Sequence, residues 1–369
     1  MALGITTAGA GVINTTTAID LIKTTLDNLD RQSFTETFAY QRYPVCEGLF
    51  QGDKLPADGG ATGRQKRIRV DVIENARGTR LYAPGSLIAK DVMQTLTWPW
   101  VMHEAGMIYE VSEVARNKGS AQIVDLVTTR RSAMWEDIAN YFERRGMISP
   151  DASTDDLNPQ GLLFHARMLA TGTSDSVGGF NGVYSQYQDG TSTASVGGIT
   201  ASTAKFNRLR NWAWTHDGVV NSTFLRQLRT AINRVNWRPP KMGTFKDPKE
   251  QRFNQFKVYW NQTSGEQYQE LVNSGPDDRE GNASPFWGDL PYGPVDTVST
   301  PVLDGVSNTP VIGIDHSVTK VVVLRGRWMV EDEPLRDPNN HRIINVWYDS
   351  EYAICCDDPR RNFCGHTAW

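Results

Sequence analysis

The sequence contains little of what secreted and membrane proteins require. It has four cysteines in 369 residues, which is too few for a disulfide scaffold and indicates free thiols in a reducing compartment. No apolar run approaches the ~20 residues needed to span a bilayer. The first twenty residues lack both the basic start and the apolar core of a secretory leader. We therefore expect a soluble protein with no membrane partner.

An excess of charge of one sign is also missing. The chain has 38 basic and 42 acidic residues, a net charge of −4, and no long basic block. Strong binding to nucleic acid or to an anionic membrane is therefore not expected from the overall charge. A local basic face stays open as an alternative.

The common catalytic motifs are missing as well. The chain has no HExxH, no G-x-S-x-G, no phosphate-binding P-loop and no strand-linked G-x-G-x-x-G. Carboxylate pairs could serve a carbohydrate-active enzyme that uses tryptophan platforms, and this alternative stays open. Adjacent acids in turns are usually solvated, however, so we expect no catalysis and no cofactor. The pairs are Asp155–Asp156, Asp277–Asp278, Glu331–Asp332–Glu333 and Asp357–Asp358.

The closing stretch CCDDPRRNFCGHTAW holds three of the four cysteines and one histidine. Zinc sites usually take two ligands two to four residues apart. Here Cys355 and Cys356 are adjacent and would point to opposite faces of a strand, and Cys364 and His366 follow eight and ten residues after Cys356. We expect buried thiols beside a polar turn and no metal.

The first hundred residues predict two arms. Residues 1–46 begin with a Gly- and Thr-rich lead, and residues 18–29 have the apolar spacing of a short amphipathic helix. In RQKRIRVDVIEN, residues 68, 70 and 72 are apolar, whereas Arg67, Arg69 and Asp71 alternate with them. Residues 92–100 read as the returning strand. A two-stranded ribbon is marginal alone, so this hairpin predicts a partner surface.

The remaining elements mix helices and strands. The spacing predicts a helix capped by Ser120 that runs to about Arg145 and stops at Gly146. It also predicts a helix over 221–235, a buried strand over 256–260, and a helix from Ser264 to about Gly275 with Gln267 closing a capping box. Two further strand regions, 320–334 and 341–356, are joined by a polar tip, LRDPNN.

The order of these elements resembles the major capsid proteins of tailed bacteriophages, the shell fold named after phage Hong Kong ninety-seven. The stretches that carry the resemblance are TWPWVMHEAGMIYEVSEVARNKGSAQIVDLVTTRRSAMWEDIANYFERRG, NPQGLLF, GGITASTAKFNRLRNWAW, FKVYWNQTSGEQYQELVNS and WMVEDEPLRDPNNHRIINVWYDSEYAICCDDPRRNFCG. They cover most of the chain from about residue 40 onward.

This resemblance implies an α+β fold in five parts. These are an N-terminal arm (1–46), an extended loop or E-loop (47–105), a peripheral P domain with a spine helix (106–150), an axial A domain (151–320) and closing strands with the P-domain hairpin (321–369). It implies hexamers and pentamers that tile an icosahedral shell around double-stranded DNA. The axial loops would be residues 275–293, with 171–199 as the second choice.

Interface residues are implied by the same resemblance. The E-loop would lie over a neighbouring subunit, and the hairpin tip would meet its counterparts where capsomers join. The residues expected there are Arg67, Arg69, Lys90, Asp337, Asn339, Asn340 and His341. Arg67 and Arg69 are as compatible with a solvated face as with acids on a neighbour.

Two further features of the family bear on partners. Some relatives carry a cleaved N-terminal scaffolding segment, whereas the arm here starts almost at Met1, so we expect a separate scaffolding protein, a portal and optional decoration proteins. Some relatives form a Lys–Asn crosslink promoted by a Glu. Residues of these types stand at Lys66 or Lys90, Asn339 or Asn340, and Glu331 or Glu333, but residue types alone do not predict the bond. An encapsulin-like nanocompartment shell stays open as the alternative.

Overall fold

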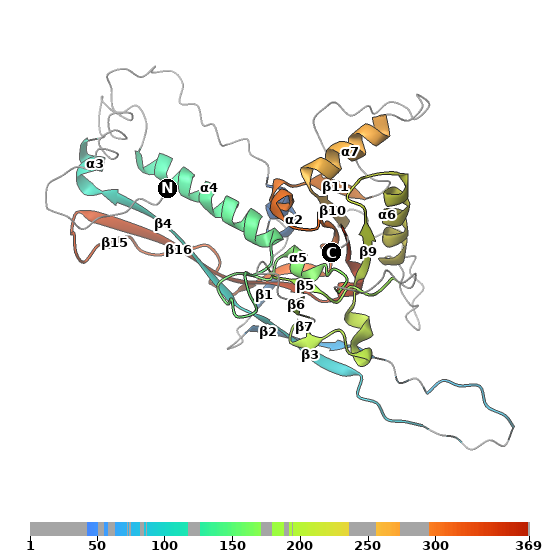
Figure 1. Ribbon diagram of the computed structural model, residues 1–369. Coiled ribbons are helices and arrows are strands. Elements are labelled where there is room, and N and C mark those ends of the chain that lie inside the picture. Colours follow the sequence, from blue (N-terminus) through green and yellow to red (C-terminus); the bar gives the residue numbers. More distant parts are fainter. Residues whose placement is uncertain are drawn as a thin grey trace. The chain divides into compact units, whose positions relative to one another are not determined.

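The computed structural model describes residues 43–50, 55–57, 63–116 (except 72, 74, 82–84 and 86), 126–170, 179–187, 192–193, 195–235, 256–273 and 295–367. The described residues divide into two units (Figure 1). The smaller unit holds Glu104–Ala139 and Met329–Asp349, and the larger holds Tyr43–His103, Asn140–Trp328 and the chain from Ser350 onward. The expected arm over 1–46 lies outside the described residues, apart from its end at 43–46.

A five-stranded mixed sheet forms the centre of the larger unit. Its order is β11-β10-β12-β17-β9, in which β10–β11 and β17–β9 are parallel and the other two pairs are antiparallel. The strands are β9 (Trp212–His216), β10 (Phe256–Trp260), β11 (Asp296–Ser299), β12 (Val311–Asp315) and β17 (Phe363–Thr367). Most of their residues are buried on both faces, which confirms the predicted buried strand over 256–260.

Two helices belong to this sheet. Helix α6 (Ser222–Val235) begins after Asn221, whose Oδ1 accepts a bond from the Phe224 amide at 2.8 Å, as an N-cap does. Its apolar face packs with Trp212 and Trp214 of β9 in one buried cluster. Helix α7 (Gln262–Asn273) begins two residues before the predicted start. Its cap is Asn261, which bonds the Ser264 amide, while Gln267 bonds the Val220 amide instead of closing a capping box.

The predicted hairpin is present as β2 (Gly63–Arg69) and β3 (Met93–Pro99), paired antiparallel with Gly63 opposite Pro99 and Arg69 opposite Met93. Its base is held in a buried cluster that includes Leu96, Trp98, Val322, Ala353 and Cys355. The Thr97 amide also donates to the Gly197 carbonyl at 3.0 Å. The base of the hairpin is therefore fixed to the larger unit by core packing.

The second sheet is organised by one long strand, β16 (Ile343–Cys356). In the larger unit, its later half pairs with β13 (Thr319–Leu324), which pairs in turn with β1 (Leu55–Ala57). In the smaller unit, its earlier half pairs with β14 (Val330–Glu331) and β15 (Leu335–Arg336). Strand β4 (Val101–Glu110) also pairs with β16.

The long helix α4 spans Leu126–Met147, and its expected start at Ser120 lies outside the described residues. With 22 residues it is about 33 Å long. The helix ends at Met147, one residue beyond the predicted stop at Gly146. A Cβ at Gly146 would lie 3.1 Å from Val45 Cγ1, so the glycine allows close packing and does not terminate the helix.

Short elements complete the fold. They are α2 (Pro44–Leu49), α3 (Val111–Arg116), α5 (Leu162–His165), the 3-10 helices η2 (Ala204–Leu209), η4 (Pro301–Gly305) and η5 (Pro359–Arg361), and the strand pairs β5 (Ser185–Gln186) with β6 (Ser192–Thr193) and β7 (Ser195–Val196) with β8 (Ile199–Thr200). Among the described helices, none combines the length and apolar character that a membrane span requires.

Candidate functional site

The closing cysteines are packed as apolar side chains. Cys355 belongs to the cluster at the hairpin base, and Cys356 Sγ accepts a bond from Asn362 Nδ2 at 3.3 Å. All four cysteines are free thiols. Burial raises the pKa of Cys355 and of Cys356 to about 12, so neither is a thiolate at neutral pH and neither is activated as a nucleophile.

His366 has a structural role beside these thiols. Its Nε2 accepts a bond from the Leu169 amide at 3.1 Å, and its Nδ1 donates to the Thr367 carbonyl at 2.8 Å. Both ring nitrogens are thus engaged by the backbone. In the described part of the chain, no group of three or more His, Cys, Asp or Glu side chains could hold a metal ion.

The carboxylate pairs form ion pairs and turns. Glu331 Oε1 accepts from Arg131 Nη2 at 2.5 Å, and the same nitrogen bonds Tyr348 Oη at 3.0 Å. Asp155 accepts the amides of Asp151, Leu157 and Asn158, as a turn-forming aspartate does. Asp357 pairs with Lys66, and Asp358 accepts the Arg360 amide. The pair at 277–278 lies outside the described residues.

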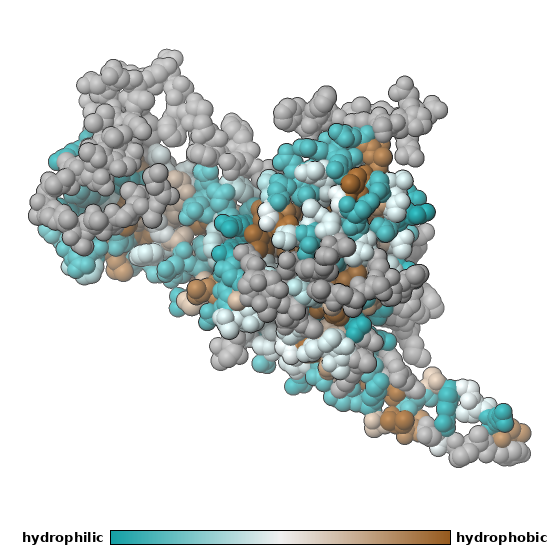
Figure 2. Space-filling model, in the orientation of Figure 1, coloured by the Kyte–Doolittle hydropathy of each residue, from teal (hydrophilic) through white to brown (hydrophobic). Residues whose placement is uncertain are grey.

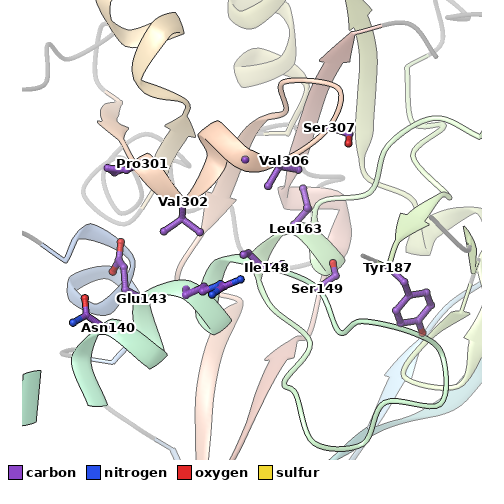
Figure 3. Close-up of a pocket in the computed structure, with 12 residues that line it drawn as sticks. Asn140, Glu143, Ile148, Ser149, Leu163, Tyr187, Pro301, Val302, Val306 and Ser307 are labelled. Atoms are coloured by element: carbon purple, nitrogen blue, oxygen red, sulfur yellow. The ribbon is translucent and has the colours of Figure 1, made fainter. Parts of the chain in front are cut away.

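One cavity of about 550 Å³ lies in the larger unit, between the end of α4, α5 and η4 (Figure 3). Of its lining residues, Glu143 is the single carboxylate and no histidine is among them. The lining comprises Asn140, Glu143, Arg144, Ile148, Ser149, Leu163, Tyr187, Pro301, Val302, Gly305, Val306 and Ser307.

The Glu143 carboxylate is committed to a helix terminus. Its Oε2 accepts the amides of Val45 and Cys46, both at 2.9 Å, in the first turn of α2. Burial raises the pKa of Glu143, while these two amides and the Cys46 thiol counteract part of that rise. The group therefore satisfies two amides at the start of α2 that have no acceptor within the helix.

Replacing Glu143 with alanine should lower the free energy of unfolding by about 2–3 kcal/mol, because one buried and one partly buried amide lose a charged acceptor. Urea denaturation of the unassembled protein measures this. The control is Asp137→Ala, an exposed position on the same helix, which should change stability by less than about 0.5 kcal/mol. Equal stability of the two variants would contradict the capping role.

Apolar side chains are exposed on the outer part of the hairpin, residues 70–92, which we call the outer arm. Leu81 and Leu87 are each 85% exposed, Ile88 is 67% and Ile73 is 52% exposed. Figure 2 shows separate hydrophobic patches, in brown, among hydrophilic residues on the arm at the lower right. Single exposed leucines are ordinary in soluble proteins, but several on one narrow ribbon indicate a surface that is covered in an assembly.

The outer arm is held together by side chains where the strand ladder ends. Asn75 bonds both the amide and the carbonyl of Ile88, at 3.1 and 2.9 Å. Lys90 Nζ lies 2.8 Å from Asp71 Oδ2, and Asp71 is only 8% exposed. Asp71, which alternates with the apolar residues of this strand, is therefore buried, and Lys90 is engaged within its own arm. Arg67 and Arg69 are exposed on β2.

The other expected interface residues lie together in the smaller unit, in one turn between β15 and β16. Asp337 Oδ1 accepts the amides of Asn339 and Asn340, at 2.7 and 3.3 Å, and Asn340 Oδ1 accepts the Arg342 amide. Asn339, Asn340 and His341 are exposed. Asp337 therefore shapes the turn, and its neighbours form the exposed tip.

Sequence reasoning missed an apolar face on the sheet of the smaller unit. Ile108 on β4, Trp347 on β16 and Leu335 on β15 are 45, 40 and 59% exposed. A Cβ at Gly106 would lie 2.8 Å from Trp347 Cε3, which shows that the tryptophan lies over β4. The neighbouring Tyr348 points the other way and contacts Trp135 of α4 edge to face, with the ring centroids 5.2 Å apart. Because adjacent residues of a strand point to opposite faces, the neighbouring aromatic residues Trp347 and Tyr348 were the signal in the sequence for a second, exposed apolar face.

Comparison with known proteins finds similar structures but no similar sequences. The chain matches no protein-family model and no curated protein by sequence. It is similar to a subunit of the capsid of cyanophage A-1(L), with a TM-score of 0.58 and 11% identity over 92% of this chain and 96% of that one.

Two further capsid structures agree with this likeness. The capsid of the native GTA particle has a TM-score of 0.56 and 10% identity, with 93% and 96% of the two chains covered. The capsid of the Myoviridae phage XM1 has a TM-score of 0.51 and 10% identity, with 97% and 100% covered. The predicted α+β architecture is thus confirmed, and over more than nine tenths of its length the chain has the fold of phage capsid subunits.

Proposed function

We propose that this chain is the major capsid protein of a tailed phage and has a structural, non-catalytic role. Copies would form hexamers and pentamers that close into an icosahedral shell around double-stranded DNA. The observation that carries this proposal is the likeness to capsid subunits along almost the whole chain. The exposed apolar side chains of the outer arm support it, because they give each subunit a surface suited to another copy.

Each of the five parts expected from the sequence is assigned its own role in the shell. Residues 1–46 form the arm, 47–105 the E-loop, 106–150 the P domain with its spine helix, 151–320 the A domain, and 321–369 the closing strands. The outer arm would lie on a neighbouring subunit, and the tip at Asn339–His341 would meet other capsomers. Lys90 would act by stiffening the arm through Asp71. Assembly in the host cytoplasm would use a separate scaffolding protein and a portal, and decoration proteins would bind afterwards.

The content of assembled particles tests this function. Particles purified from cells that express the chain with the other structural genes of its source should hold DNA that resists nuclease until the shell is opened. Particles that hold one folded enzyme and no DNA would contradict the proposal and favour a nanocompartment shell. Particle formation that is unchanged in chelator would show that no metal at Cys355–His366 is needed for assembly.

Replacing Glu331 with glutamine separates the proposal from a glycosidase. A shell protein should show no glycoside hydrolysis before or after the change, because Glu331 pairs with Arg131 at an exposed position. The matched control is Asp332→Asn. Hydrolysis of any polysaccharide in a substrate panel that is lost in Glu331→Gln alone would overturn the structural role.

A further inference from the structure

At one edge of the five-stranded sheet, where β9 and β17 begin, arginines gather from three separate segments. Strands β9 and β17 are parallel, with Trp212 opposite Phe363, so the segments that precede them lie at the same edge. These segments are η2 and η5, and the two pack against each other. Helix α6 runs back along β9, which brings its last turn to this edge. The residues are Arg208, Arg210, Arg234, Arg360 and Arg361, which we call the arginine edge.

Two of these guanidinium groups are held by aromatic rings. Arg360 lies 4.2 Å from the centroid of Phe180, and Arg234 lies 5.6 Å from the centroid of Trp212. The two rings contact each other edge to face at 5.4 Å. Such stacking fixes the orientation of a guanidinium and leaves its N–H groups directed outward.

The edge has an excess of positive charge. Arg361 forms ion pairs with Asp315 and Asp358, at 3.4 and 3.3 Å, whereas the third nearby aspartate, Asp357, pairs with Lys66. Burial lowers the pKa of Arg360 and the positive charge of Arg208 lowers it further, which places these two cations close together. Five arginines against two aspartates leave about three positive charges on a chain whose net charge is −4.

Helix α6 extends this charge along its exposed side. Its sequence STFLRQLRTAINRV contains three arginines and no acidic residue. Arg226, Arg229 and Arg234 are all exposed. At 1.5 Å per residue, they spread over about 12 Å of the helix, a length along which DNA presents several phosphates.

We propose that the arginine edge and the exposed side of α6 bind the phosphate backbone of duplex DNA without sequence preference. Planar guanidinium forks match phosphate oxygens in two-point contacts, and every cation of the edge is an arginine. Backbone binding of this kind needs charge and no apolar groove. The choice of DNA as the polyanion rests on the proposed function, whereas the existence of an anion-binding surface does not.

The test uses the full-length, unassembled chain and a fluorescein-labelled 30-base-pair duplex of random sequence, followed by anisotropy from 50 to 200 mM KCl. The variant Arg208→Gln/Arg234→Gln/Arg360→Gln should bind at least about tenfold more weakly at 50 mM, and its log–log salt slope should be shallower by about three. The control Arg67→Gln/Arg69→Gln/Arg80→Gln removes the same charge from the hairpin arm and should bind within about threefold of the parent chain.

A single substitution controls for the chance that the triple variant misfolds. Arg208 is partly exposed, so Arg208→Glu should fold normally and still weaken binding. Equal DNA binding by the triple variant and its control, or binding of poly-glutamate in preference to DNA, would overturn the inference. Electron microscopy of the same variants keeps the two proposals apart. Shells without a DNA effect would refute the edge alone, and DNA binding at the edge without shells would refute the capsid role alone.

Discussion

Replacing Leu81, Leu87 and Ile88 with serine should abolish shell assembly and leave the subunit folded. These side chains are 67–85% exposed in the single chain, so the change removes no core contact. Burying one such side chain in an interface contributes about 1.5–3 kcal/mol. Losing three at each subunit contact would weaken association by at least about 4 kcal/mol, or about a thousandfold.

Sedimentation velocity and negative-stain microscopy measure this effect. The serine variant should remain as subunits or capsomers at concentrations where the parent chain forms particles, with an unchanged circular dichroism spectrum. The matched control, Arg80→Gln, alters an exposed polar residue of the same arm and should still assemble. Normal particles from the serine variant would show that the outer arm is not an assembly surface.

Acid should destabilise the unassembled subunit strongly between pH 7 and pH 5. Burial lowers the pKa of His165 and of His216 to about 4 and that of His316 to about 3. The neighbouring cations Arg167 and Lys257 lower the pKa of His165 and of His316 further, and the neighbouring His366 ring does so for His216. These values lie below the ~6.5 of an unfolded chain, so the folded state binds fewer protons. The stability is present above pH ~6.5 and is lost as the pH falls below it.

The expected loss from the three histidines is about 5 kcal/mol at pH 5 relative to pH 7, since each pKa unit corresponds to ~1.4 kcal/mol. Burial raises the pKa of Glu143 and of Asp358, so these acids offset part of the loss at lower pH. Urea denaturation at pH 7, 6 and 5 measures the effect.

Variants assign the acid sensitivity to particular residues. The double variant His165→Gln/His316→Gln should flatten the pH dependence, whereas His341→Gln, at an exposed position, should not. An unfolding free energy that is the same at pH 7 and pH 5 would contradict the account.

Most of the elements that the sequence predicted have one buried face or a clear cap, and β10, which is buried on both faces, is rich in aromatic and β-branched residues. Alternation around Ile68 identified the hairpin, and Asn221 marked the start of α6. Strands β9, β12 and β17 were missed because most of their residues are buried on both faces, which removes the period of two. The glycine in β12 is explained by packing, since a Cβ at Gly313 would lie 2.3 Å from the Phe363 ring.

The candidate surfaces were harder to predict than the fold. The sequence pattern predicts only that Lys90 is exposed. The pairing of the two hairpin strands is what places its ammonium group beside the Asp71 carboxylate. Arg208 and Arg360 stand far apart in the chain, and the parallel pairing of β9 with β17 is what brings them together. Such long-range pairings follow from tertiary packing and leave no local signal in the sequence.

The central claim is that copies of this chain close into a shell. Its most direct test is cryo-electron microscopy of the protein purified after expression with the other structural genes of its source, in reducing buffer. We expect closed particles with fivefold and sixfold clusters of subunits, in which the outer arm of one subunit contacts another. A homogeneous 41.2 kDa monomer under the same conditions, with no rings, tubes or shells at any concentration, would contradict it.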